Sequence, residues 1–187
     1  MEQNNYKCTI GKFFRHLNTV NKHRFKVFCL CCKVGIPWRG LVHDLSKYSP
    51  TEFWEGVKYY QGTYSPITNC KKEKGYSEAW LHHFGRNKHH YEYWVDYAAP
   101  VQTPIIPYCY FAEMLCDTLA AGMTYQGKNW TKEYQLSYWK KTEKKRKMNP
   151  KIEALLTKIY TDIAKDCMDK VLSKKNLQKL YQEYTKE

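Results

Sequence analysis

The chain has 187 residues, of which 43% are hydrophobic and 26% are charged, and its formal net charge is +13. This length is typical of one domain, and the mixture of apolar and charged residues excludes a disordered chain. No apolar stretch approaches the roughly 20 residues that a membrane-spanning helix needs, and the first residues lack a signal-peptide pattern. We therefore expect a single cytoplasmic domain over 1–187 with no membrane partner, divided into a site-bearing core over 12–127 and a basic helical appendage over 128–187.

Helical patterns recur along the chain and alternating strand patterns are absent, which predicts an all-α fold. The first helix is expected over about 12–33, because Gly35 and Pro37 end it. Its expected apolar contacts are Phe14, Leu17, Val20, Phe25, Phe28 and Leu30.

The next two helices follow closely. One is expected to begin near Trp38 and to carry the segment RGLVHDLSK. Ser49, Pro50 and Glu52 then form a capping box with proline at the first helical position, which starts another helix. Residues 61–75 are expected to form a loop.

The middle of the chain predicts two further helices. The first opens near Ser77 and carries EAWLHHFGRNKHHYEYW, although Gly85 makes it less regular. A stretch rich in proline, 100–107, separates it from a helix with the sequence YCYFAEMLCDTLAAGM.

Helices beyond residue 129 are expected to pack on this core. Asn149 and Pro150 cap one of them, and Ser173 starts the last. Between two helical patterns lies the run KKTEKKRK, residues 140–147. Excess positive charge favours anionic partners, namely phosphorylated small molecules or nucleic acid, but such a run is more often a solvated face than a binding site.

The histidines give the strongest functional signal. Imidazole and carboxylate groups bind divalent zinc, manganese, iron, cobalt and nickel, and helical bundles build metal sites from side chains on facing helices. We therefore expect one or two divalent transition-metal ions. All seven histidines precede residue 91, at His16, His23, His43, His82, His83, His89 and His90.

The adjacent pair His43-Asp44 is the centre of this prediction, because it can supply an imidazole and a carboxylate to one ion. Lys47 follows within a helical turn, near enough to meet a phosphate beside the metal. Further along the chain, Glu113 and Asp117 are four residues apart and share a helix face. Asp117 is a candidate ligand, and Glu113 is either a partner that orients an imidazole or an exposed acid.

These motifs resemble the HD superfamily of metal-dependent phosphohydrolases. The family motif is a leading histidine, a His-Asp pair often followed by a lysine, and a distant aspartate, with extra histidines in its two-metal branch. The resemblance implies an HD-like helical bundle whose metal ligands are His23, His43, Asp44, His83, His89, His90 and Asp117. More narrowly, HDLSKYSPTEF, AWLHHFGRNKHHYEYW and EMLCD resemble a family of unknown function from bacteria and phages, over roughly residues 15–125.

Two ligand assignments stay open at this point. His16 lies seven residues before His23, on nearly the same helix face, and could replace or support it. His83 and His90 share the same spacing, so His90 is favoured over His89 if only one of them binds.

The resemblance implies hydrolysis of a nucleotide or another phosphoester, and the sequence does not distinguish between these substrates. Asp44 and Lys47 are the expected catalytic residues, and Lys47, Arg86 and Lys88 are expected to contact the phosphate, with Arg39 as a further candidate. Two alternatives are a di-iron oxygenase on the same fold and a basic nucleic-acid-binding or host-interaction protein with a structural metal. The sequence leaves the oligomeric state open.

Overall fold

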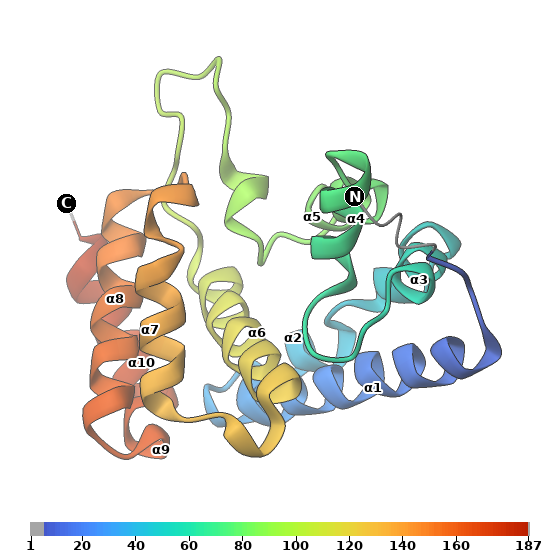
Figure 1. The fold of residues 1–187 in the computed structure, drawn as a ribbon. Helices are drawn as coiled ribbons and strands as arrows, with labels where there is room; N and C mark the ends of the chain where they lie inside the picture. The colour runs from blue at the N-terminus through green and yellow to red at the C-terminus, as the bar shows by residue number, and fades with distance from the viewer. Residues whose placement is uncertain (1–5, 187) are drawn as a thin grey trace.

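The computed structural model describes residues 6–186, and this part of the chain is all-α and contains no strand (Figure 1). None of its helices combines the length and apolarity needed to cross a membrane. The helices are α1 (Ile10–Lys33), α2 (Pro37–Val42), α3 (Pro50–Lys58), α4 (Pro66–Lys74), α5 (Glu78–Phe84), α6 (Tyr108–Gln126), α7 (Lys132–Lys141), α8 (Pro150–Lys165), α9 (Met168–Val171) and α10 (Lys174–Thr185). Short 3-10 turns cover Leu45–Tyr48, Tyr91–Trp94, Gly127–Asn129 and Glu143–Lys145.

Helix α6 lies at the centre of the fold and packs against α1 (Figure 1). Helices α7, α8 and α10 lie on one side of α6. Helices α3, α4 and α5 lie on its other side, towards the N-terminal end of α1. A single cluster of buried apolar side chains joins α1, α6, α8 and α10. The basic region after residue 128 therefore shares the hydrophobic core of the preceding residues.

The buried face of α1 differs from the expected one. Its buried side chains are separated by three or four residues, as on one stripe of a helix, and two of them are histidines. Phe14 and Phe25 were expected to make apolar contacts, but they are 61% and 67% exposed, because they lie on the other side of the helix. The buried residues of α1 are His16, Val20, His23, Val27, Leu30 and Cys31.

The expected loop over 61–75 is wrong, because most of it forms α4. Pro66 occupies the start of this helix, where its missing N–H costs nothing. At the other end, Gly75 has φ 82°, a left-handed conformation that suits glycine and ends the helix. The Ser-Pro and Gly signals at its two ends are therefore the ones that sequence analysis missed.

Helix α5 is shorter than expected. It begins after Ser77, whose hydroxyl caps the Trp80 amide, and it ends at Phe84. The Asn87 side chain donates a hydrogen bond of 2.7 Å to the carbonyl of His83, at the point where the helix stops. His89 therefore lies outside any helix, on the turn that precedes Tyr91–Trp94.

The other expected caps are confirmed. Ser49 accepts a hydrogen bond from the amide of Glu52, and Pro50 is at the first position of α3. Asn149 caps α8, and Ser173 caps α10.

Candidate metal centre

The pair His43-Asp44 lies directly after α2, where the chain turns sharply. Helix α2 ends at Val42, so the expected continuous helix through RGLVHDLSK is broken, and Lys47 lies in the following 3-10 turn. Asp44 has φ 54°, the single non-glycine residue of the described chain with a positive φ. Such a backbone costs on the order of 1–3 kcal/mol and marks functional sites. The turn buries both side chains, each 1% exposed or less.

The two carboxylate oxygens of Asp44 face two different groups of histidines. Oδ2 lies 3.1 Å from Nε2 of His43 and 3.6 Å from Nε2 of His23. Oδ1 lies 3.3 Å from Nε2 of both His83 and His89. A carboxylate placed in this way is suited to bridge two ions.

The potential ligand atoms that include Asp44 form two sets, each with its atoms within 4.8 Å of one another, and a third group of the same kind joins His43, His89 and Glu113. Asp44 belongs to both sets, and α6 contributes Asp117, whose Oδ1 lies 3.0 Å from Nε2 of His23. These buried clusters could hold a metal ion. The first set is His23, His43, Asp44 and Asp117, and the second is Asp44, His83, His89 and His90.

Several ligand atoms are buried without a hydrogen-bond partner. Buried polar atoms in proteins are nearly always paired, so a concentration of unpaired atoms at one place needs an explanation. Their chemical types are those that bind divalent transition metals. The atoms without a hydrogen bond are both carboxylate oxygens of Asp44 and Nε2 of His23, His43, His89 and His90, although Lys47 makes an ion-pair contact with Oδ2 of Asp44 and Asp117 makes one with His23.

Glu113 orients one imidazole from each set. Its Oε1 lies 3.0 Å from Nδ1 of His43 and 3.2 Å from Nδ1 of His89. Because an ionised carboxylate only accepts hydrogen bonds, both Nδ1 atoms donate, and Nε2 is the nitrogen that each ring can offer to a metal once it has lost its proton. Arg39 donates from Nε to Glu113 Oε2 at 2.7 Å and so holds the carboxylate in place. Glu113 is 1% exposed, so the interpretation as an exposed acid is wrong.

Glu52 orients the imidazole of His83 as Glu113 orients those of His43 and His89, and sequence analysis did not predict this role. Its Oε2 lies 2.7 Å from Nδ1 of His83, and its Oε1 lies 2.7 Å from Nδ1 of His82. Glu52 occupies the third position of α3, where an acid is expected simply as part of a capping box. The capping-box interpretation therefore did not predict the contacts of Glu52 with His82 and His83.

The charges of the site shift its pKa values strongly. Burial alone would raise the pKa of Asp44, but the charges of His43, Lys47 and His83 hold it well below its usual range. Burial would also raise the pKa of Glu113, and the hydrogen bonds from His43 and His89 lower it to about 2. Burial, together with the neighbouring charge of His89, lowers the pKa of His90, which keeps its imidazole in the neutral form that binds metal.

Lys47 lies within the site, with Nζ 2.6 Å from Oδ2 of Asp44. Burial would lower its pKa, but the carboxylates of Asp44 and Asp117 raise it above the ordinary value, so the amine stays charged. Lys47 therefore contributes a fixed positive charge beside the potential ligands.

The other expected phosphate contacts lie elsewhere. Arg86 is exposed and donates to the carbonyl of His82. Lys88 is also exposed, with Nζ 5.7 Å from the ring centres of Tyr93 and Tyr110. Neither side chain lines the cavity beside the potential metal ligands. Their expected phosphate contacts are therefore not supported.

The two open ligand assignments are resolved by position. His23 lies in the first set, whereas His16 belongs to neither set and lies nearer the N-terminus of α1. Both His89 and His90 lie in the second set, because α5 ends at Phe84 and the turn after it brings both rings inward. The preference for His90 applied only if one of the two binds, and the end of α5 at Phe84 is the helix break that lets His89 join it.

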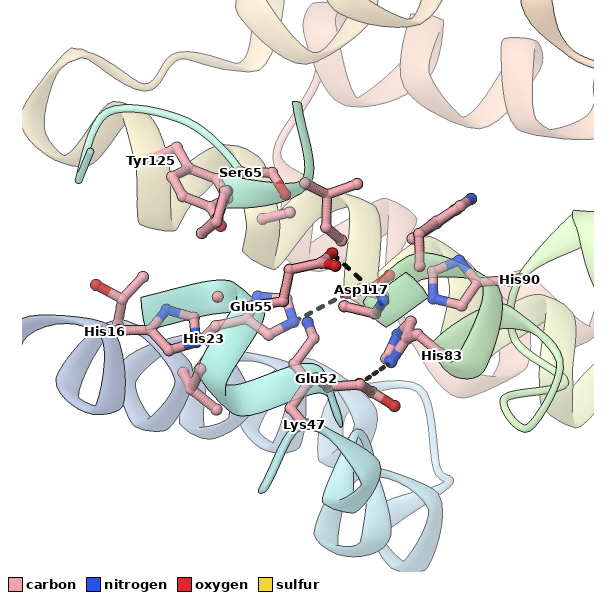
Figure 2. Close-up of a pocket in the computed structure, with 18 residues that line it drawn as sticks. His16, His23, Lys47, Glu52, Glu55, Ser65, His83, His90, Asp117 and Tyr125 are labelled. Atoms are coloured by element: carbon pink, nitrogen blue, oxygen red, sulfur yellow. Dashed lines mark hydrogen bonds and ion pairs between the residues drawn. The ribbon is translucent and has the colours of Figure 1, made fainter. Parts of the chain in front are cut away.

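A cavity of about 180 Å³ opens beside the two sets (Figure 2). Helices α1, α3, α5 and α6 all contribute to its wall, and His23, His83, His90 and Asp117 lie along it. These four potential ligands therefore border a space that a small molecule could occupy, whereas His43, Asp44 and His89 do not line it.

Comparison with known proteins places the chain in a family. The model of a family of unknown function (DUF5662) matches residues 12–162, so the chain belongs to this family. The match extends through α7 and most of α8, beyond the region 15–125 that the motifs indicated. No curated protein and no solved structure matches significantly.

Proposed function

We propose that this member of a family of unknown function is an HD-type, metal-dependent phosphohydrolase with a dinuclear centre. The observation that carries the proposal is the position of Asp44, whose Oδ2 faces His23 and His43 and whose Oδ1 faces His83 and His89. One carboxylate shared by two sets of ligands is suited to a pair of neighbouring ions, which many phosphoester hydrolases use. The ligand types suit manganese, iron, cobalt, nickel or zinc.

The reaction is transfer of a phosphoryl group to water. A new P–O bond forms from the water oxygen, the ester P–O bond breaks, and the leaving oxygen takes a proton. Divalent ions at such a site polarise the phosphoryl oxygens and lower the pKa of water from about 16 towards 7.

The residues of the chain have separate roles in this proposal. The charged amine of Lys47 attracts the anionic group and offsets its charge. Glu113 and Glu52 fix the tautomers of His43, His89 and His83, so that each presents Nε2 to the centre. The net charge of +13 favours approach of an anionic substrate. We also propose a cytoplasmic location, where a reducing environment keeps cysteines free, as all eight are here.

Elemental analysis of protein purified without added metal tests the proposal. We expect close to two ions per chain in the wild type and fewer than one in Asp44→Ala. Asp169→Ala is the matched control, because Asp169 is an exposed aspartate on α9 and should keep the wild-type content.

The same preparations are assayed for phosphatase and phosphodiesterase activity with manganese, nickel or iron. Metal-dependent phosphate release that is lost in Asp44→Ala supports the proposal. Coloured protein with bound iron and no phosphate release would favour the di-iron oxygenase instead. Absence of metal in the wild type would refute the proposal and favour the basic binding protein, for which neutralising residues 140–147 is the next experiment.

A further inference from the structure

The cavity beside the metal ligands extends along α1 and ends at His16. His16 and His23 both line it, and they are seven residues apart on the same helix. At 1.5 Å per residue, this separation is about 10 Å along the helix axis. Figure 2 shows His16 at one end of the cavity, His83 and His90 at the other, and His23 and Lys47 between them. A substrate with its phosphate at the ligands would direct the rest of its structure towards His16.

The cavity wall has little positive charge. Among the described residues that line it, Lys47 is the single lysine or arginine, and its amine already contacts Asp44. Three carboxylates also line the cavity, from Glu52, Glu55 and Asp117. A second phosphate placed away from the metal ligands would meet acids and no free cation, and burial of such an unpaired charge is costly.

The end of the cavity near His16 is neutral. The His16 side chain is buried, and its Nδ1 has no hydrogen-bond partner. Burial, with a smaller contribution from the charge of Lys47, lowers the pKa of His16 to about 4. The ring is therefore uncharged at neutral pH.

Gly56 closes this end tightly. A Cβ atom on Gly56 would lie 2.3 Å from Nε2 of His16, so any larger residue would push the imidazole from its place. The remaining wall is largely apolar and includes Val20, Ile67 and Ala121. The cavity, at about 180 Å³, is also smaller than the roughly 300–1,000 Å³ of sites that enclose drug-sized ligands.

On the basis of the function proposed above, we infer that the substrate is a small phosphomonoester with one phosphate, whose short, uncharged group occupies the cavity between the metal ligands and His16. Nucleoside triphosphates and phosphodiesters with two large groups are excluded by the charge and the length of this cavity. His16 and Gly56 then determine which leaving groups fit.

Steady-state kinetics of the metal-loaded wild type with three probes test the substrate class. The probes are phenyl phosphate, ATP and bis(4-nitrophenyl) phosphate. We expect kcat/KM for phenyl phosphate to exceed that for each of the others by on the order of 100-fold, because like charge and excess size both oppose binding. Equal or faster hydrolysis of ATP or of the diester would overturn the inference.

Variants of the cavity wall test whether the uncharged group of the substrate occupies this cavity. Gly56→Ala displaces the His16 ring from the cavity wall, and Ala121→Leu narrows the cavity from α6 in case the first variant folds poorly. Each should raise KM for phenyl phosphate about tenfold or more, which is the effect of changing one or a few carbon atoms in a pocket. Gly11→Ala is the matched control, since Gly11 is exposed on the same helix as His16 and outside the cavity.

A binding measurement separates this inference from the proposed function. Phenylphosphonate cannot be hydrolysed at its C–P bond, so the increase in Tm that it causes reports binding alone. We expect an increase in the wild type and in Gly11→Ala, and little or none in Gly56→Ala and Ala121→Leu. Binding without hydrolysis of any probe would refute the proposed function and leave the assigned cavity intact. Equal increases in all four proteins, or none in the wild type, would refute the cavity assignment.

Discussion

The two sides of α6 bury different kinds of side chain. Towards α8 and α10, α6 places Phe111, Leu115 and Leu119 in a continuous apolar core. Towards His23 of α1, the turn at His43-Asp44 and His83 of α5, the buried groups are histidines and carboxylates, including Glu113 from the same helix, whereas the C-terminal half of α1 contributes to the apolar core. Burial of apolar groups stabilises the folded state, whereas burial of unpaired polar groups costs free energy. The comparison indicates that the apolar side holds the fold together, and under the proposed function the polar side would be stabilised by bound ions.

Removal of metal should change the free energy of unfolding more than any other treatment, and it should destabilise the polar side of α6. Two ions, each at about 100 times its Kd, would contribute about 5 kcal/mol to the free energy of unfolding. We expect chelation to lower the stability measured in urea by about this amount. Hydrogen exchange should become faster in α2, α3 and α5 while α8 stays protected. Uniform loss of protection would contradict the division between the two sides.

A substitution that leaves a void in the apolar core should lower stability and leave the candidate metal site intact. Leu155 is fully buried on α8, so Leu155→Ala should lower the free energy of unfolding by about 2–5 kcal/mol. Metal content of the folded protein should not change. Leu41→Ala is the control, because this leucine is 53% exposed and its removal should lower the free energy of unfolding far less. Loss of metal in folded Leu155→Ala would show that the two sides are strongly coupled.

The pH dependence of the polar side should include a contribution from His16. Its pKa falls from 6.5 to about 4 on folding, so the unfolded chain binds the proton more tightly. The associated stability is complete above pH 6.5, is lost as the pH falls towards 4, and amounts to about 3 kcal/mol. In metal-free protein, the decrease in stability between pH 7 and pH 4 should be smaller in His16→Gln than in the wild type. Identical decreases would contradict the buried, neutral state of His16.

Glu113→Gln should have the smallest of these effects. The substitution keeps the shape of the side chain but removes the charge that holds His43 and His89, so metal affinity should fall about 10- to 100-fold. Calorimetric titration with manganese measures this change. Glu183→Gln on α10 is the control, since its exposed carboxylate lies outside both sets of ligands. An unchanged affinity in Glu113→Gln would mean that Glu113 does not orient the ligands.

Local sequence signals predicted much of the architecture. The caps at Ser49, Asn149 and Ser173 were found because capping depends on a few adjacent residues. Helix α4 was missed although Pro66 and Gly75 mark its ends, because its polar composition resembles that of a loop. The buried face of α1 was misjudged because Phe14 and Phe25 are apolar residues that the structure leaves exposed.

By itself, the sequence determined an all-helical chain and the residue types of a metal site, because helical periodicity and ligand chemistry are properties of short segments. The potential ligands His23, His43, Asp44, His83 and Asp117 were all identifiable in this way. Tertiary structure decided that one carboxylate belongs to both sets, that Glu52 and Glu113 hydrogen-bond to the imidazoles, and that Arg86 does not line the cavity. These features depend on the left-handed turn at Asp44 and on the end of α5 at Phe84, which bring distant segments together and so cannot be read from any one of them.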